Sequence, residues 1–354
     1  MSLSKEKSCQ GYFNYCEKKL RQYPHRYPVP KLHTRYPIKR NAIDITHEHR
    51  LNEWVYSLYP SSQLSADRFL KVAKVTAIVA FFYPLPTRVD RYAELIKLMV
   101  SYFILDDHTE CGYGDVGRDV DQCRLVWTQF MTMLDDFKTP GSVPMSEWKP
   151  YLLGMYPVFK GISDTYTEQQ RERYVREFKN YAEGNIEETV ALRDGVVFTS
   201  IEQQLKIRLK TVGARPILQT MEYAYEFCLT DSEWADPRLQ ELLDLCTELT
   251  VLVNDIFSFE KEALNESHDL RRMFNTVALT AILDGCSVME AMDAIIGRIA
   301  TKEERIYCVS RDILTDGQGC SPAMEMMVRC IFYYTGGNFK YTTTLDRYHM
   351  FNKA

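Results

Sequence analysis

The chain has 354 residues, of which 45% are apolar and 26% are charged, and its formal net charge is −5. This composition is ordinary for a globular protein and excludes a disordered or fibrous class, while the net negative charge argues against a nucleic-acid-binding protein. No stretch approaches the run of about 20 apolar residues that a membrane-spanning helix needs. We therefore expect a globular protein with neither a nucleic-acid partner nor a membrane-spanning segment.

Residues 1–40 form a basic segment at the start of the chain. They contain ten Lys and Arg residues and only two acidic residues. The first ten residues lack the apolar core of a secretory signal, and three Tyr-Pro pairs in this segment oppose the amphipathic helix of an organelle transit peptide. We therefore expect residues 1–40 to be an ordered, extended N-terminal arm, followed by a single domain over residues 41–354.

Beyond the arm, apolar residues recur at the three- and four-residue steps of amphipathic helices. No segment shows the sustained alternation of a β-strand, and no Gly-, Ser- or Pro-rich linker divides the chain. The pattern predicts one all-α domain, a bundle whose facing helices carry side chains into its centre. The predicted helical segments are 49–60, 64–83, 88–108, 118–137, 166–193, 237–262, 268–284, 287–314 and 321–350, with a break at 213–216.

The ten cysteines include no Cys-x-x-Cys pair. Most of them lie inside apolar helical patterns, as Cys246, Cys308 and Cys330 do. This arrangement predicts buried, reduced thiols in a cytoplasmic protein rather than disulfides or a zinc site.

The first acidic motif is Asp-Asp-His-Thr-Glu at residues 106–110. On a helix, Asp106 and Glu110 lie one turn apart on one face, and Asp107 lies three residues before Glu110. Acids at the end of an apolar stripe should reach solvent or a cation, and carboxylates are suitable ligands for Mg²⁺. Taken alone, the motif is better explained as an acidic helix end in solvent. A similar pair, Asp135-Asp136, lacks a third acid and is expected at the surface.

The second motif is rarer, with Asn254, Ser258 and Glu262 at positions i, i+4 and i+8. On a helix these three share one face and span about 12 Å of its length. An amide oxygen, a hydroxyl and a carboxylate in a row form an all-oxygen set for a hard cation. A structural polar seam is the alternative for this motif alone. Together, the two motifs favour a metal site.

In these motifs the chain resembles the class I terpene cyclases, the terpene synthases of the microbial type. That family has an Asp-Asp-x-x-Asp/Glu motif and an Asn-Asp-x-x-Ser-x-x-x-Glu motif. The matching residues are Asp106, Asp107 and Glu110 for the first motif, and Asn254, Asp255, Ser258 and Glu262 for the second. The resemblance covers roughly residues 40–350.

Four further positions match the family's basic and hydroxyl groups that bind diphosphate. They are the sensor Arg208, which stands 46 residues before Asn254, then Lys261 before the final acid, and the terminal pair Arg347 and Tyr348. The resemblance implies that Thr211 and Val212 mark a helix break whose backbone carbonyl faces the nascent cation, with Gly213 permitting the break. Two positions depart from the family pattern, because Tyr341 replaces a common Trp and Gln204 replaces a common Tyr.

The resemblance implies a helical bundle around a deep cavity and a Mg²⁺-dependent reaction, with three Mg²⁺ ions expected. The implied substrate is an allylic prenyl diphosphate, most simply farnesyl diphosphate, which would be ionised and cyclised to a sesquiterpene with release of diphosphate. Alternatives are a diterpene cyclase that uses geranylgeranyl diphosphate, a prenyl chain-elongating synthase and an inactive helical binding protein. A homodimer is an alternative to a monomer.

The cavity wall should be aromatic, because ring faces attract cations without reacting as nucleophiles. Tyr102 and Phe103 are the strongest candidates, since they lie one turn before Asp106 on the same predicted helix. Residues 265–272, a polar stretch directly after the second motif, are a candidate lid. The full set of residues expected to line the pocket is Phe81, Phe82, Met99, Tyr102, Phe103, Tyr334 and Tyr341.

Overall fold

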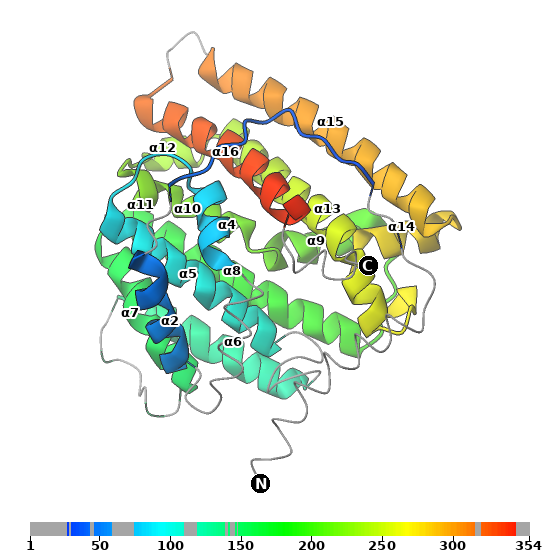
Figure 1. The fold of residues 1–354 in the computed structure, drawn as a ribbon, viewed down its shortest axis with the longest axis horizontal. Helices are drawn as coiled ribbons and strands as arrows, with labels where there is room; N and C mark the ends of the chain where they lie inside the picture. Colours follow the sequence, from blue (N-terminus) through cyan, green and yellow to red (C-terminus); the bar gives the residue numbers. More distant parts are fainter. Residues whose placement is uncertain are drawn as a thin grey trace.

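The structure is a computed structural model that describes residues 27, 30–42, 46–58, 74–109, 119–138, 141, 146, 148–315 and 320–344, excluding the side chains at 46–49, 107, 108 and 265. Within these ranges the regular structure is helical throughout and contains no strand (Figure 1). The expected all-α fold is confirmed. No helix in the described ranges is long and apolar enough to cross a membrane.

The described helices have the following bounds in chain order. They are α2 (Thr46–Leu58), α4 (Val75–Phe82), α5 (Val89–Thr109), α6 (Val120–Asp135), α7 (Pro150–Asp164), α8 (Glu168–Arg193), α9 (Ile201–Thr211), α10 (Ala214–Gln219), α11 (Met221–Tyr225), α12 (Asp231–Trp234), α13 (Pro237–Asn265), the 3₁₀ turn η2 (Leu270–Arg272), α14 (Thr276–Asp284), α15 (Val288–Leu314) and α16 (Pro322–Thr344).

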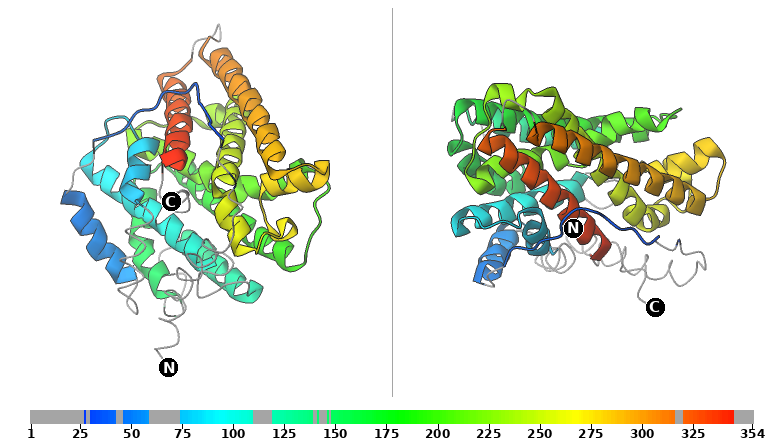
Figure 2. Two further views of the ribbon diagram at one scale, coloured as in Figure 1. Left: turned by 45° about the vertical axis from the view of Figure 1, so that its right-hand side comes forward. Right: turned by 90° about the horizontal axis from the view of Figure 1, so that it is seen from above.

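The long helix α13 joins two apolar cores. Its first half, with Leu239 and Leu242, belongs to the main core, which α5, α6, α7, α8 and α16 also form. Its second half, with Leu252 and Ile256, packs with α14 and α15 in a second core. Helix α13 packs against α15 and α16, which run beside it in Figure 2, and it also packs against α9, α10 and α14. Apolar packing therefore holds both halves of α13 in place.

Helix α7, like the shorter helices α9 to α12, has no counterpart among the predicted segments. Gly154, Pro157 and Gly161 interrupt its run of helix-forming residues, which hides the periodicity. The structure gives a reason for one of them, because a Cβ atom at Gly154 would collide with the Leu58 side chain of α2. The glycine lets two helices approach closely.

The predicted segment 268–284 is wrong over its first eight residues. Ser267 and His268 adopt left-handed backbone angles, with φ of 55° and 63°, and this turn ends α13. A 3₁₀ turn follows, and α14 begins only at Thr276, after the N-cap residue Asn275. The chain therefore changes direction directly after the second acidic motif.

The predicted break near residue 213 is present, although it begins earlier than expected. Helix α9 ends at Thr211, Gly213 has a φ of 70°, and α10 begins at Ala214, so that Pro216 lies inside α10. A Cβ atom at Gly213 would lie 3.2 Å from Cε1 of Tyr102. Both the left-handed angle and the close ring favour glycine at this position.

Residues 30–42 run extended across the outer face of the bundle (Figure 1). The Thr34 hydroxyl donates to Oε1 of Glu303 on α15 at 2.6 Å, and the Tyr36 hydroxyl donates to the Glu303 carbonyl at 2.8 Å. Further along, the Asn41 amide N–H donates to the Ala80 carbonyl of α4 at 2.8 Å. These bonds attach the segment to α15 and, further along the chain, to α4. Most of the predicted arm, residues 1–40, lies outside the described residues.

Two expectations about burial need correction. Cys246 and Cys330 are buried free thiols as predicted, and the other described cysteines are also free, but Cys308 is only half-buried. Asp136, expected at the surface, is fully buried, and its carboxylate accepts a hydrogen bond from the Tyr156 hydroxyl at 2.6 Å. Its neighbour Asp135 pairs with Lys179 at the surface, as expected.

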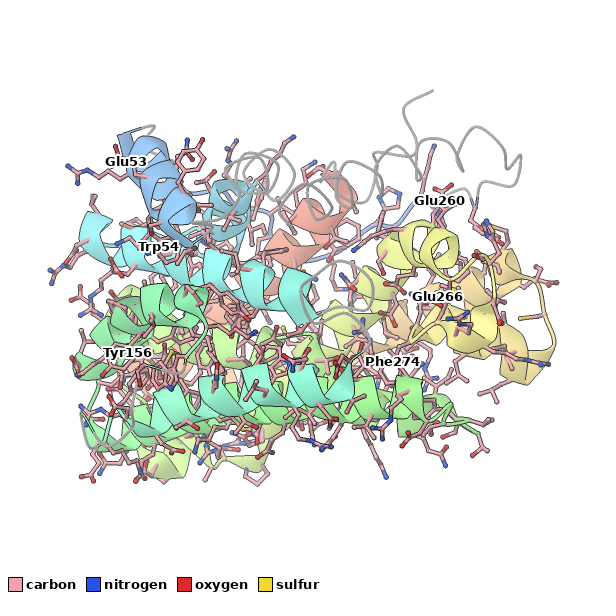
Figure 3. All side chains as sticks on the ribbon, turned by 90° about the horizontal axis from the view of Figure 1, so that it is seen from below. Glu53, Trp54, Tyr156, Glu260, Glu266 and Phe274 are labelled. Atoms are coloured by element: carbon pink, nitrogen blue, oxygen red, sulfur yellow. The ribbon has the colours of Figure 1, made fainter. Side chains whose placement is uncertain are left out.

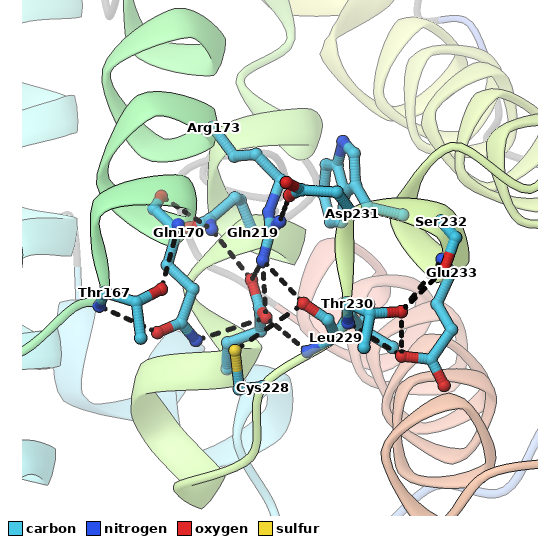
Figure 4. Close-up of polar contacts among 12 residues, drawn as sticks. Thr167, Gln170, Arg173, Gln219, Cys228, Leu229, Thr230, Asp231, Ser232 and Glu233 are labelled. Carbon is cyan, nitrogen blue, oxygen red and sulfur yellow. Dashed lines mark hydrogen bonds and ion pairs between the residues drawn. The ribbon is translucent and has the colours of Figure 1, made fainter.

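A buried ionic network holds α8 to α11 and α12 (Figure 4). Arg173 donates to Oε1 of Glu222 at 3.1 Å and to Oδ1 of Asp231 at 2.8 Å. Gln170 and Gln219 also donate to the Glu222 carboxylate. Burial raises the pKa of Glu222, and the neighbouring donors partly offset that rise.

We expect Arg173→Met to lower the free energy of unfolding by about 3 kcal/mol or more, because Glu222 would lose its buried ion-pair partner. Urea denaturation measures the change. Arg176→Met is the matched control, since Arg176 lies on the same helix with its side chain 53% exposed. Similar losses in the two variants would contradict the structural role of the network.

Candidate functional site

A cavity of about 270 Å³ lies inside the bundle. Helices α4, α5, α8, α9, α10, α13 and α16 contribute to its wall. Six of the seven residues predicted to line the pocket do so: Phe82, Met99, Tyr102, Phe103, Tyr334 and Tyr341. Phe81 is not among the lining residues, and its ring instead lies 5.9 Å from the Arg40 guanidinium carbon.

One region of the cavity wall is polar. Its described charged side chains are four carboxylates and three cations, namely Asp106, Glu188, Glu262 and Glu266 with Arg208, Lys261 and Arg272. The described lining therefore has a net negative formal charge. An anionic ligand would enter this region only together with additional cations.

Helix α5 brings the first acidic motif to the cavity. Met99, Tyr102, Phe103 and Asp106 all line it, because the spacing i, i+3, i+4 and i+7 places them on one helical face. The carboxylate of Asp106 thus continues an aromatic and apolar stripe. The side chain of Asp107, the whole of Glu110 and the pair Arg347 and Tyr348 lie outside the described residues.

Helix α13 contributes a longer polar stripe than the motif alone indicates. Five residues spaced four apart line the cavity: Thr250, Asn254, Ser258, Glu262 and Glu266. We call this set the α13 stripe. On the other side of α13, Leu252, Ile256 and Phe259 are buried in the second core. The structure therefore brings Asp106 and the second motif together at one cavity, from helices far apart in sequence.

Arg208 lies at the centre of a buried hydrogen-bond network. Its Nη2 donates to the Asp255 carboxylate and, at 3.4 Å, to Oδ1 of Asn254, while its Nη1 donates to the Thr211 hydroxyl at 3.3 Å. Burial opposes the charge of the guanidinium, but the nearby carboxylates, with Asp255 first, outweigh it and raise the pKa of Arg208. Thr211 and Val212 also line the cavity.

Arg208 does not pair with Glu202, the acid nearest to it on its own helix. Glu202 pairs instead with Arg298 of α15, at 2.6 Å. Only 9% of Arg208 is exposed, and it faces the cavity rather than the surface.

Asn275 is a site residue that the sequence reasoning missed. Its Nδ2 donates to Oε2 of Glu262 at 2.9 Å and to the Asp255 carbonyl at 2.9 Å. Its Oδ1 accepts from the Val277 amide at 2.9 Å and thereby caps α14. The sequence signal for this role is the preference of Asn for helix N-caps, but the apolar pattern predicts a helix that continues through residue 275.

Glu262 is held in an unusual electrostatic environment. Burial and the Asp255 carboxylate raise its pKa to about 7, against the opposing effect of Arg208. The Ser258 hydroxyl, one turn earlier, is buried and forms no hydrogen bond of good geometry with a described residue, although it lies near enough to Glu262 to lower the pKa of that group. A buried hydroxyl and a carboxylate with a raised pKa are both groups that a cation would stabilise.

These residues fit a divalent metal with oxygen ligands. Asp106 and the α13 stripe offer carboxylate, amide and hydroxyl oxygens, the donors that hard cations such as Mg²⁺ prefer. Within the described part of the chain, no group of three His, Cys, Asp or Glu side chains could hold a metal by itself. Among the described residues, the oxygens that face the cavity include the Asn254 amide and the Ser258 hydroxyl as well as carboxylates.

Comparison with known families gives one match over more than half of the chain. Residues 97–305 match the family described as terpene synthase family 2, C-terminal metal binding. The matched range contains Asp106, Arg208 and the whole α13 stripe.

Curated relatives carry names from the same group. The chain is 24% identical over 237 residues to a terpene cyclase of Annulohypoxylon truncatum, covering 66% of this chain and 61% of that protein. It is 38% identical over 93 residues to a (-)-beta-caryophyllene synthase of Saccharothrix espanaensis, described as cyclising (2E,6E)-farnesyl diphosphate, covering 26% of each chain. The chain thus spans less than two thirds of the length of these relatives.

Solved structures share the fold. The α-eudesmol synthase structure superposes with a TM-score of 0.75 at 17% identity, covering 89% of this chain and 99% of that one. A linalool/nerolidol synthase from Streptomyces clavuligerus gives a TM-score of 0.74 at 17% identity, covering 90% and 100%. At these identities the comparison supports the architecture alone.

We expect Asn275→Ala to lower the free energy of unfolding by about 1–2 kcal/mol, because α14 loses its cap and Glu262 loses a donor. Asn275→Ser keeps a capping oxygen but lacks the amide donor, so its loss should be smaller than that of the alanine variant. Chemical denaturation of both variants separates the two contributions. A serine variant as stable as the unaltered protein would contradict a role for the Nδ2 donor.

Proposed function

Because the chain belongs to terpene synthase family 2, we propose that it is a class I terpene cyclase, which ionises an allylic prenyl diphosphate and cyclises the carbocation. One observation carries the proposal: Asp106 from α5 and the α13 stripe meet at a single cavity whose remaining wall is largely aromatic and apolar. A polar region that can hold metal and diphosphate beside an apolar region that can hold a hydrocarbon chain is the arrangement that this reaction requires.

The polar residues would act on the leaving group. Breaking the allylic C–O bond places negative charge on diphosphate, and preplaced positive groups must stabilise that charge. Mg²⁺, with three ions expected, would supply most of the neutralisation when bound. The proposed ligands are Asp106, Asp107, Glu110, Asn254, Ser258 and Glu262.

Arg208 and Lys261 would bind the diphosphate oxygens directly. A guanidinium can donate two parallel hydrogen bonds to phosphate, whereas an ammonium acts as a point charge. The network with Asp255 and Asn254 would hold Arg208 in position before the substrate arrives. Arg347 and Tyr348 are proposed to serve the same anion, on the basis of the motif alone.

The apolar wall would protect the cation. Tyr102, Phe103 and Tyr334 present aromatic rings to the cavity, and ring faces stabilise positive charge without capturing it. Helix α9 ends beside this wall, at Thr211 and Val212, and the last carbonyl groups of a helix lack intrahelical partners. We propose that one of these carbonyls faces the nascent cation. Exclusion of water from this region prevents premature quenching.

We propose farnesyl diphosphate as the substrate and a sesquiterpene as the product. A relative with 38% identity over part of the chain is described as cyclising (2E,6E)-farnesyl diphosphate. Geranylgeranyl diphosphate is the alternative substrate.

We expect incubation with Mg²⁺ and farnesyl diphosphate to yield cyclic C15 products and free diphosphate, detected by mass spectrometry and a diphosphate assay. Parallel incubations with geranyl and geranylgeranyl diphosphate establish the chain length. Longer prenyl diphosphates as products would indicate a chain-elongating synthase instead. Absence of diphosphate release from every substrate would indicate a binding protein, and activity in excess EDTA would contradict the metal requirement.

We expect Asp106→Ala and Glu262→Ala each to reduce turnover by more than about 100-fold, because each removes a proposed metal ligand. The circular dichroism spectra of both variants should remain those of a helical protein. Asp135→Ala is the matched control, since Asp135 is a surface acid outside the cavity. Full activity in either of the first two variants would refute the metal assignment.

A further inference from the structure

One cationic residue of the cavity lining has no place in the sequence motifs. Arg272 lies on η2, the turn that follows α13, and lines the cavity together with Glu266, Met273 and Phe274. Figure 3 shows Glu266 and Phe274 at one end of the molecule, far from Trp54 and Tyr156 at the other. Arg272 therefore belongs to the same region of the cavity as the α13 stripe.

Glu266 forms an ion pair with Arg272 that does not have the geometry of a hydrogen bond. Nε of Arg272 lies 3.1 Å from Oε2 of Glu266, whose side chain is only 12% exposed. Glu266 is the last member of the α13 stripe, one helical turn beyond Glu262. The backbone positions of Glu262 and Glu266 differ by about 6 Å along the helix axis, so the ion pair places the guanidinium near the last turn of the stripe.

The other two nitrogens of Arg272 remain available. Neither Nη1 nor Nη2 forms a hydrogen bond with a described residue, and the side chain is 53% exposed. A guanidinium has five N–H donors, so an arginine held through Nε can present its Nη groups to a second acceptor. Arg208, by contrast, already directs both Nη groups to partners within the protein.

The backbone supports this presentation. Ser267 and His268 both have left-handed φ angles, a conformation that costs non-glycine residues roughly 1–2 kcal/mol each. The resulting sharp turn brings η2 back beside the end of α13, so that Arg272 can reach Glu266. A helix continuing through this segment would carry residue 272 further along the axis.

We propose that Arg272 is a diphosphate-binding residue, anchored by Glu266 and presenting its Nη groups to the anion at the polar region of the cavity. The inference rests on the proposed function, because it takes the diphosphate of a prenyl substrate as the ligand. Glu266 is then a positioning residue. Arg272 is then the third described cation of the lining, beside Arg208 and Lys261, and the net formal charge of the described lining is negative with all three counted.

The test compares two adjacent arginines by isothermal titration calorimetry with inorganic diphosphate and Mg²⁺. Arg272→Gln should weaken diphosphate binding about tenfold or more, through loss of charge-assisted hydrogen bonds. Arg271→Gln, with the same change in net charge at an exposed residue outside the cavity lining, should change the dissociation constant less than about twofold. Arg272→Lys should fall between them, because it keeps the charge but loses the planar fork.

A second variant tests the anchor. Glu266→Ala removes a negative charge, so simple electrostatics predicts tighter diphosphate binding, whereas loss of the anchor predicts weaker binding. Weaker binding by Glu266→Ala supports the positioning role, and tighter binding overturns it. Unchanged thermal unfolding in all variants separates these effects from misfolding.

The outcomes distinguish this inference from the proposed function. Equal affinities in the Arg271→Gln and Arg272→Gln variants, with binding retained by the unaltered protein, would overturn the role of Arg272 alone. No binding of diphosphate by the unaltered protein would overturn both. A higher KM for farnesyl diphosphate in Arg272→Gln, with a smaller change in kcat, would support binding of the substrate's own diphosphate.

Discussion

The buried carboxylate of Asp255 is the point at which three helices are joined. It accepts a hydrogen bond from Arg208 of α9 and another from the Thr276 amide at the start of α14, while its own helix is α13. The Asp255 carbonyl accepts from Asn275, which also holds Glu262. A charge with no exposed surface is stable only with such partners. The position of Arg208 and the orientation of Glu262 both depend on this one residue.

The two cores around α13 explain why a polar stripe can persist on a buried helix. Leu252, Ile256 and Phe259 give one face enough apolar contact to hold the helix in place. The opposite face can then carry oxygen-bearing side chains toward the cavity at the cost of desolvation. The buried Ser258 hydroxyl and the raised pKa of Glu262 are signs of that cost. A bound cation would offset this desolvation cost.

The charge of the lining indicates the order in which cations and diphosphate would bind. Carboxylates outnumber cationic side chains in the described lining, so diphosphate alone would be repelled. In the proposed reaction, divalent cations would make the same carboxylates metal ligands and would leave the arginines to bind phosphate oxygens. Arg208 is buried beside the helix break, whereas Arg272 is half-exposed on η2. Each is held by a carboxylate of the protein.

The sequence by itself determined most of the long helices and the residues that each of them places on one face, because a period of 3.6 residues is a local property. That is enough to align Met99 and Tyr102 with Asp106, and Asn254 with Ser258 and Glu262. Only the tertiary structure decided that these two faces meet, since α5 and α13 are far apart in sequence. It also decided the positions of Asn275 and Arg272 beside Glu262 and Glu266, because the left-handed turn at Ser267 and His268 interrupts a segment whose apolar pattern favours a continuous helix.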